Sequence, residues 1–131
     1  MTGSTPFSIE KYPKFQRSLK ECAKKYGKDE FRDWIAKIIG DLTENPYPNN
    51  SRQESLPKKA RLPEGCTFHK LAVSFAKGAS GQIRLMYVVN PVSCKILLFW
   101  IYSHEDIEKR PRDKDITSAL KELLYLTTEE S

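Results

Sequence analysis

The stretch GQIRLMYVVNPVSCKILLFWIYSH, which spans residues 81–104, decides the fold of this chain. It contains two runs rich in Ile, Val, Leu and aromatic residues, at 83–89 and 95–102, with Asn-Pro-Val-Ser at 90–93 between them. Two such runs separated by a short turn predict an antiparallel β-hairpin. The second run is nearly all apolar, which is typical of a central strand covered on both faces.

One positive charge, Arg84, interrupts the first of these runs. Side chains alternate between the two faces of a strand, so we expect Arg84 on the same face as Met86 and Val88. The apolar and aromatic residues at 83, 85, 87 and 89 then lie on the other face. A cation in the middle of a sheet either pairs with a carboxylate, for which Glu105 is a candidate, or has a function.

Length and composition bound the class of protein. At 131 residues the chain fits one domain with a two-layer core, and 39% hydrophobic and 30% charged residues are ordinary for a soluble globular protein. No apolar run is long enough to span a membrane and the first six residues do not resemble a signal peptide, so we expect a cytoplasmic protein. The net charge of +5 favours a polyanionic partner.

The three cysteines, Cys22, Cys66 and Cys94, form an odd set without a Cys-x-x-Cys pair. Their spacing is not that of a disulfide framework or of a zinc site, and no Cys-His pair has the spacing of a known nucleophile. We therefore expect buried or half-buried thiols, and a protein without a metal or cofactor.

Two helices are predicted before the hairpin. Residues 7–12 alternate between apolar and polar side chains, which predicts a short first strand, and Pro13 suits the first turn of a helix. Asp29 can cap a second helix, which ends at Asn45-Pro46. The apolar stripe of the first helix, which ends at Gly27, is Phe15, Leu19, Cys22 and Tyr26. The apolar face of the second is Phe31, Trp34, Ile35, Ile38, Ile39 and Leu42.

Residues 46–65 form a basic, proline-rich connection without helical or strand periodicity. A third strand is predicted at 66–75, where alternation places Lys70 on the face of Arg84 and His69 on the apolar face. A glycine-rich turn at 76–81 leads from this strand into the hairpin. After Pro111, an aspartate at 113 or 115 can cap a closing helix whose buried stripe is Ile116, Leu120, Leu123 and Leu124.

These elements follow in the order β-α-α-β-β-β-α, which predicts a single domain of the α+β class over residues 1–131. We expect the N-terminal helical hairpin to pack on one face of a mostly antiparallel sheet of three or four strands. The opposite face, with Lys70 and Arg84, is expected to be at least partly open. Residues 111–131 form a C-terminal helix and tail.

Four blocks of the sequence resemble the RelE/ParE superfamily of bacterial toxins: FSIEKYPKF at 7–15, LPEGCTFHKLAV at 62–73, GQIRLMYVV at 81–89 and KILLFWIYSHED at 95–106. The last two are most similar to the YhaV-type toxins, in which an arginine-containing strand precedes an aliphatic strand that ends in aromatic and acidic residues. The resemblance spans Phe7 to Arg110 and implies a RelE-like fold.

The resemblance also implies an endoribonuclease that cuts messenger RNA, on the ribosome or free, and that an antitoxin protein neutralises. By position, Arg84 matches the arginine of the Arg-Leu-x-Tyr strand of these toxins. Lys70 lies near the strand position of the RelE lysines, and His104 falls where several relatives place a basic residue after the final strand.

Cleavage of RNA by its own 2′-hydroxyl needs a proton acceptor, a proton donor and cations for the phosphate, and it requires no metal. We predict that Lys70 and Arg84 hold the phosphate and that His104 transfers a proton. Glu105 or Asp106 is predicted to orient His104 or to act as a base. The predicted RNA contacts are Lys58, Lys59 and Arg61 of the basic connection and His69 of the third strand.

Each of these residues also has a structural interpretation. Lys70 can extend into solvent, His69 can be a hydrogen-bonded packing residue, and His104 can be a turn residue. The basic connection can be a solvated loop without a binding role. Two aromatic residues of the last strand, Trp100 and Tyr102, either belong to the core or stack on an RNA base.

Two other functions remain open for the whole chain. A non-catalytic module with the same fold can bind RNA or a protein partner through its sheet and its basic connection. Inhibition of DNA gyrase is a third possibility, suggested by the ParE toxins. Discrete RNA ends distinguish the nuclease from the binding module, and a supercoiling assay identifies a gyrase inhibitor.

Overall fold

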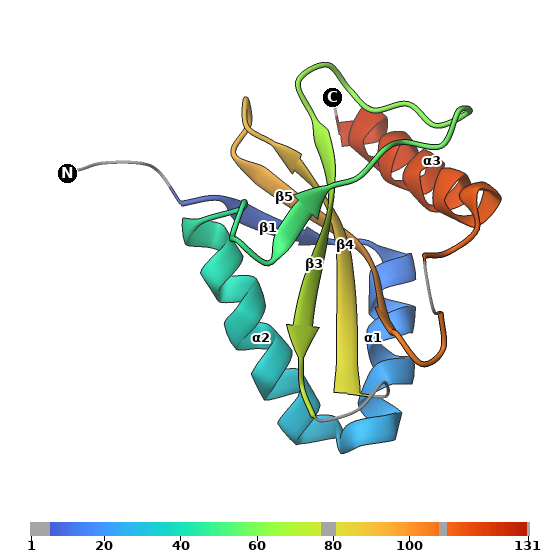
Figure 1. Cartoon of the computed structure of the whole chain (residues 1–131). Coiled ribbons are helices and arrows are strands. Elements are labelled where there is room, and N and C mark those ends of the chain that lie inside the picture. The colour runs from blue at the N-terminus through green and yellow to red at the C-terminus, as the bar shows by residue number, and fades with distance from the viewer. Residues whose placement is uncertain (1–5, 77–80, 108–109, 131) are drawn as a thin grey trace.

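The computed structural model describes residues 6–76, 81–107 and 110–130, with the side chains of the last helix described as far as Leu123 (Figure 1). The glycine-rich turn predicted at 76–81 lies largely outside these ranges, as does the side chain of Leu124. The helices and strands confirm the predicted α+β class and are, in order, β1 (Ser8–Lys11), α1 (Pro13–Tyr26), α2 (Lys28–Glu44), β2 (Ser51–Gln53), β3 (Thr67–Ser74), β4 (Gln82–Asn90), β5 (Lys95–Ser103) and α3 (Asp113–Glu130).

The sheet has five strands in the order β1-β5-β4-β3-β2. Strand β1 pairs in parallel with β5, and the other pairings are antiparallel. This is one strand more than the four in the predicted order of elements, because β2 forms inside the connection that was expected to lack structure. Three residues are too few to show the period-two alternation that identifies a strand in a sequence.

The two N-terminal helices form the predicted hairpin around a single glycine. Pro13 occupies the start of α1, where its missing N–H is not needed. Gly27, with φ of +89°, ends α1 and is followed directly by α2. Helix α2 starts at Lys28, so Asp29 lies in its first turn and does not cap it. At that position the carboxylate still interacts favourably with the helix dipole.

On the face of the sheet under α1 and α2, the residues of β4 are all apolar or aromatic. Ile83, Leu85, Tyr87 and Val89 are completely buried there, as the predicted alternation requires. Phe15, Leu19 and Cys22 of α1 and Phe31, Ile35, Ile39 and Leu42 of α2 pack against them.

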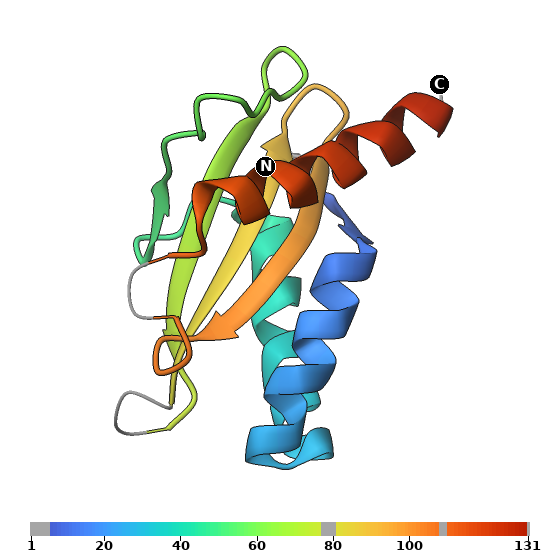
Figure 2. The same cartoon turned by 90° about the vertical axis from the view of Figure 1, so that its right-hand side faces the viewer.

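Helix α3 crosses the opposite face of the sheet (Figure 2). It covers a second core cluster, which includes Phe68, Met86, Val88, Phe99, Ile116 and Leu120. Closer to the other end of the strands on this face, Ala72 is exposed and Arg84 is half-buried. The face expected to be open is therefore open only in the part that α3 does not cover.

A β-bulge in β5 increases the aromatic content of this second cluster. Leu98 faces Tyr87 and Trp100 faces Met86, which leaves Phe99 without a partner on β4. As a result the consecutive residues Phe99 and Trp100 both pack on the α3 side. Trp100 is a core residue, 7% exposed, with Lys14 Nζ 4.0 Å from the centre of its ring.

Candidate functional site

Three cations from three neighbouring strands line one hollow on the uncovered part of the sheet. Arg52 of β2 faces Lys70 of β3, and Ala72 of β3 faces Arg84 of β4. Cross-strand partners project from the same face of a sheet. The hollow has a volume of about 400 Å³ and is lined by Asn49, Asn50, Ser51, Arg52, Lys70, Ala72 and Arg84. The structure thus brings the predicted pair Lys70 and Arg84 together and adds Arg52.

The Arg84 guanidinium is available to a ligand. Its Nη1 donates a hydrogen bond to the carbonyl oxygen of Ile83 at 3.1 Å. Among the residues that the structure describes, no carboxylate lies within ion-pair distance of it, so the alternative pairing with Glu105 is not formed. A half-buried guanidinium without a carboxylate partner favours an anionic ligand.

Lys70 belongs to a line of alternating charges. Its Nζ lies 3.8 Å from Oε1 of Glu54, and the same oxygen lies 3.3 Å from Nη1 of Arg110. Nη2 of Arg110 in turn lies 2.9 Å from Oδ1 of Asp113, at the start of α3. Because the Glu54 side chain is only 12% exposed and is shared by two cations, it fixes the position of the Lys70 ammonium at the edge of the hollow.

Tyr102 faces Arg84 across β4 and β5; its side chain belongs to the second core cluster and does not line the hollow. The residue is 3% exposed, and its hydroxyl has no hydrogen-bond partner within the described part of the chain. Burial raises the pKa of Tyr102 to about 12; the nearby Arg84 and Arg110 lower it and Glu54 raises it. The phenol therefore keeps its proton at neutral pH, and its hydroxyl is a covered donor, on the strand next to Arg84, without a partner among the described residues.

His104 and Glu105 follow the end of β5. The backbone nitrogen of His104 donates to the carbonyl oxygen of Gln82 at 2.7 Å, which continues the ladder by one row and places His104 on the face of Arg84. His104 is half-buried, and Glu105 is exposed in the turn that follows. Neither lines the hollow, so the structure does not bring the predicted proton carrier into the hollow with the cations.

His69 lies on the other face of the sheet, as strand alternation predicted. It is 5% exposed, its Nε2 lies 2.6 Å from the hydroxyl of Thr67, and its ring stacks on Tyr87 with centroids 5.4 Å apart. Burial lowers the pKa of the imidazole. In this position His69 is a packing residue that does not reach the hollow with Arg84.

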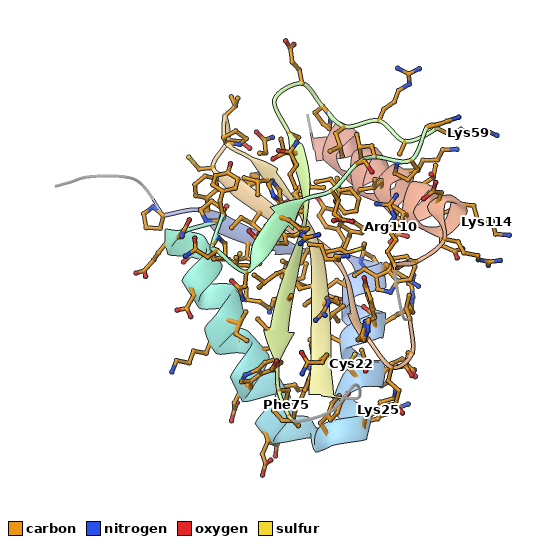
Figure 3. All side chains as sticks on the ribbon, in the orientation of Figure 1. Cys22, Lys25, Lys59, Phe75, Arg110 and Lys114 are labelled. Carbon is orange, nitrogen blue, oxygen red and sulfur yellow. The ribbon has the colours of Figure 1, made fainter. Side chains whose placement is uncertain are left out.

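The predicted RNA contacts of the basic connection are all exposed. Lys58 and Lys59 line a second hollow together with residues of α3, whereas Arg61 does not. Figure 3 shows Lys59 and Lys114 at the same edge of the molecule, with Arg110 closer to the sheet.

Arg52, Glu54 and Arg110 were not predicted from the sequence, and Tyr102 was predicted only as a stacking or core residue. Three of these four lie in segments without periodicity, so no pattern connects them to Lys70 and Arg84. Tyr102 could have been connected to Arg84 only through the pairing of β4 with β5. That pairing depends on the position of the bulge in β5.

Within residues 6–76, 81–107 and 110–123, no group of three or more His, Cys, Asp or Glu side chains is arranged to hold a metal ion. None of the described helices has the length and apolar character needed to cross a membrane.

Comparison with known proteins identifies the fold. No family model and no curated protein matches the chain. The RelE–RelB complex from the archaeon Pyrococcus horikoshii is similar, with a TM-score of 0.51 and 12% identity over 75% of this chain and 94% of that chain. At this identity the likeness establishes a RelE-like fold and nothing beyond it.

Two other solved structures are similar to the chain with lower scores. A mutant of the Escherichia coli toxin RelE in the free state has a TM-score of 0.45 and 18% identity, over 79% of this chain and 88% of that chain. A conserved hypothetical protein of Helicobacter pylori has a TM-score of 0.47 and 20% identity, over 77% of this chain and 98% of that chain.

Proposed function

We propose that this chain is the toxin of a toxin–antitoxin pair and that it cleaves messenger RNA. The observation that carries the proposal is the cationic hollow, in which Arg52, Lys70 and Arg84 converge from three strands and Arg84 has no carboxylate partner among the described residues. The RelE-like fold supports it, because the similar archaeal structure is a RelE–RelB complex.

In the proposed reaction the 2′-oxygen of a ribose attacks the adjacent phosphorus. The new bond joins the 2′-oxygen to phosphorus and the bond from phosphorus to the 5′-oxygen breaks, which leaves a 2′,3′-cyclic phosphate and a 5′-hydroxyl. Arg84 and Lys70 hold the phosphate and stabilise the negative charge that develops on it. The Tyr102 hydroxyl donates a hydrogen bond to a phosphate oxygen.

His104 carries the proton in this scheme. It accepts the proton of the 2′-hydroxyl, Glu105 orients the imidazole, and solvent in the open hollow supplies the proton that the 5′-oxygen takes. Glu54 is a positioning residue, since it holds Lys70 and does not face the substrate. No step uses a metal ion.

A small antitoxin is the proposed protein partner. The exposed and half-buried cations of the hollow are complementary to an acidic segment, which would cover them and exclude RNA. The cytoplasm, where messenger RNA is translated, is the proposed location.

Replacement of Arg84 tests the proposal. In Arg84→Ala we expect RNA cleavage to fall by about 10²–10³-fold, which is the usual effect of removing one group that stabilises transition-state charge. The measurement is the rate at which discrete RNA ends form, with and without ribosomes, together with growth of cells that express the protein. Arg32→Ala, an exposed arginine of α2 on the far face, is the control and should leave both readouts unchanged.

A second variant tests the hollow without removing a cation. Ala72 is exposed and faces Arg84, so the carboxylate in Ala72→Glu would pair with the guanidinium and repel phosphate. It should abolish cleavage and leave stability unchanged, whereas Ala36→Glu on α2 should affect neither. Wild type that binds RNA without producing ends would establish a binding module in place of a nuclease. Full toxicity of Arg84→Ala would remove Arg84 from the mechanism.

A further inference from the structure

A second cationic hollow lies between the basic connection and α3. Its volume is about 520 Å³, and four of its lining residues are lysines: Lys58 and Lys59 from the connection, and Lys114 and Lys121 from α3. Pro57, Asp113, Thr117 and Ser118 complete the lining. All four lysines are exposed.

These lysines are not neutralised by their surroundings. Within the described part of the chain none of the four forms an ion pair with a carboxylate. The one carboxylate in the lining, Asp113, is already paired with Arg110. Four like charges around one hollow repel each other, so an anion that binds there is stabilised by all of them.

The segments that carry the lysines are held in place. Lys58 and Lys59 are the central residues of a turn closed by a hydrogen bond from Ala60 N to Pro57 O at 3.0 Å. Pro57 and Ala60 are both buried, and Ala60 belongs to the cluster under α3. Lys114 and Lys121 are seven residues apart on α3, two helical turns, so they share one face of the helix. The backbone positions that carry the four lysines are therefore fixed by a hydrogen bond, by packing under α3 and by the helix itself.

Ion pairs connect this hollow to the first one. Arg110 contacts Asp113, which lines the second hollow, and Glu54, which contacts Lys70 of the first. Arg110 therefore lies between the two hollows. A polyanion that extends from Lys70 past Arg110 reaches the lysines of the basic connection and of α3.

We propose that the second hollow binds the phosphodiester backbone of the same RNA strand, several nucleotides from the phosphate held by Arg84. This inference rests on the proposed function, and it names the part of the substrate that the connection and α3 recognise. Its lining favours nucleic acid over an acidic protein segment, because it offers ammonium groups and hydroxyls and only one apolar residue, Pro57, as an anchor. Recognition through lysines and backbone phosphates carries no base preference.

Two RNA lengths test the proposal. The variant Lys58→Ala/Lys59→Ala/Lys114→Ala/Lys121→Ala is compared with Lys20→Ala/Lys24→Ala/Lys28→Ala/Lys37→Ala, which removes the same charge from exposed positions of α1 and α2. Fluorescence anisotropy with a 20-nucleotide and a 4-nucleotide RNA gives the affinities. We expect the first variant alone to lose about tenfold or more in affinity for the long RNA, while both variants bind the short RNA like wild type.

The salt dependence gives a second readout. Each phosphate contact contributes about 0.7 to the slope of log K against log salt for a single strand, so the slope for the long RNA should fall by up to about 3 in the first variant. Equal slopes and affinities for the two variants would overturn the proposal, as would loss of binding to poly-glutamate without loss of binding to RNA. Cleavage by wild type is measured separately. If it is absent, the proposed nuclease activity is wrong, whereas the proposed binding of RNA to the second hollow is tested only by the affinities and slopes.

Discussion

The two faces of the sheet are closed to different extents. Under α1 and α2 the residues of β4 are completely buried and even His69 of β3 is only 5% exposed, although Val73 at the edge of this face is half-buried. On the α3 side Met86 is fully buried, but Arg84, two residues earlier on the same strand, is half-buried and lines a hollow. One strand therefore contributes to a dry core and to a cationic surface on the same face.

The difference between Arg84 and Met86 shows that alternation determines the face on which a side chain lies but not whether that side chain is buried. Alternation assigns Arg84 and Met86 to one face, but the position of α3 decides which of them is removed from water. A guanidinium under α3 would be buried without a carboxylate, at a cost of several kcal/mol. At the uncovered end it keeps contact with solvent, and the burial of the neighbouring apolar residues holds the strand that presents it. The candidate site is therefore possible only where the second layer of the fold ends.

The largest effect on stability is expected in the covered part of the α3 face. Phe99 is completely buried and its ring lies 5.5 Å from that of Phe68, so Phe99→Ala should lower the free energy of unfolding by about 3–5 kcal/mol. Urea denaturation followed by circular dichroism measures this. Val92→Ala, at a position that is 85% exposed, is the control and should change the free energy of unfolding by less than about 0.5 kcal/mol. If Phe99→Ala is as stable as wild type, α3 does not close that part of the sheet.

At Tyr102, on the strand next to Arg84, an intermediate effect on activity and almost none on stability is expected. Tyr102→Phe removes a buried hydroxyl that has no partner among the described residues, so the free energy of unfolding should stay the same or rise slightly. Cleavage should fall by about tenfold, the effect of one hydrogen bond to a charged ligand. The measurement is the rate of RNA cleavage at saturating enzyme.

Tyr26 provides a matched control on the other face. Its hydroxyl is also buried without a partner in the described part of the chain, but it packs against Phe31 and Phe75 under the helical hairpin. Tyr26→Phe should therefore leave cleavage unchanged. Equal activities of the two variants would show that the Tyr102 hydroxyl has no part in the reaction.

The elements with strong periodicity could be predicted from the sequence alone. The hairpin, the stripes of α1 and α2 and the shared face of Lys70 and Arg84 all follow from local alternation or helical spacing. Each of these depends only on residues close together in the chain, or on two strands joined by a short turn.

The rest depends on contacts between distant segments. Glu54 reaches Lys70 because the backbone nitrogen of Glu54 donates to Phe68 O at 2.8 Å at the end of the short pairing of β2 with β3. The Arg110 contact joins two aperiodic segments that are 56 residues apart. The bulge at Phe99 changes the face of every later residue of β5 relative to simple alternation, so Tyr102 could not be assigned to the side of Arg84 from its sequence position.

The smallest effect is expected on the closed face and concerns pH. Burial lowers the pKa of His69, whose ordinary value is 6.5, and no carboxylate forms an ion pair with it in the described residues. Below pH 6.5 the unfolded chain then binds a proton at this position before the folded chain does, so the folded state loses stability as the pH falls from 6.5 toward the folded pKa. Urea midpoints at pH 7.5, 6.5 and 5.5 should decrease more steeply for wild type than for His69→Gln, which cannot titrate. Parallel curves for the two proteins would mean that His69 takes up its proton in the folded state as easily as in water, and that the face under the helical hairpin is not closed at β3.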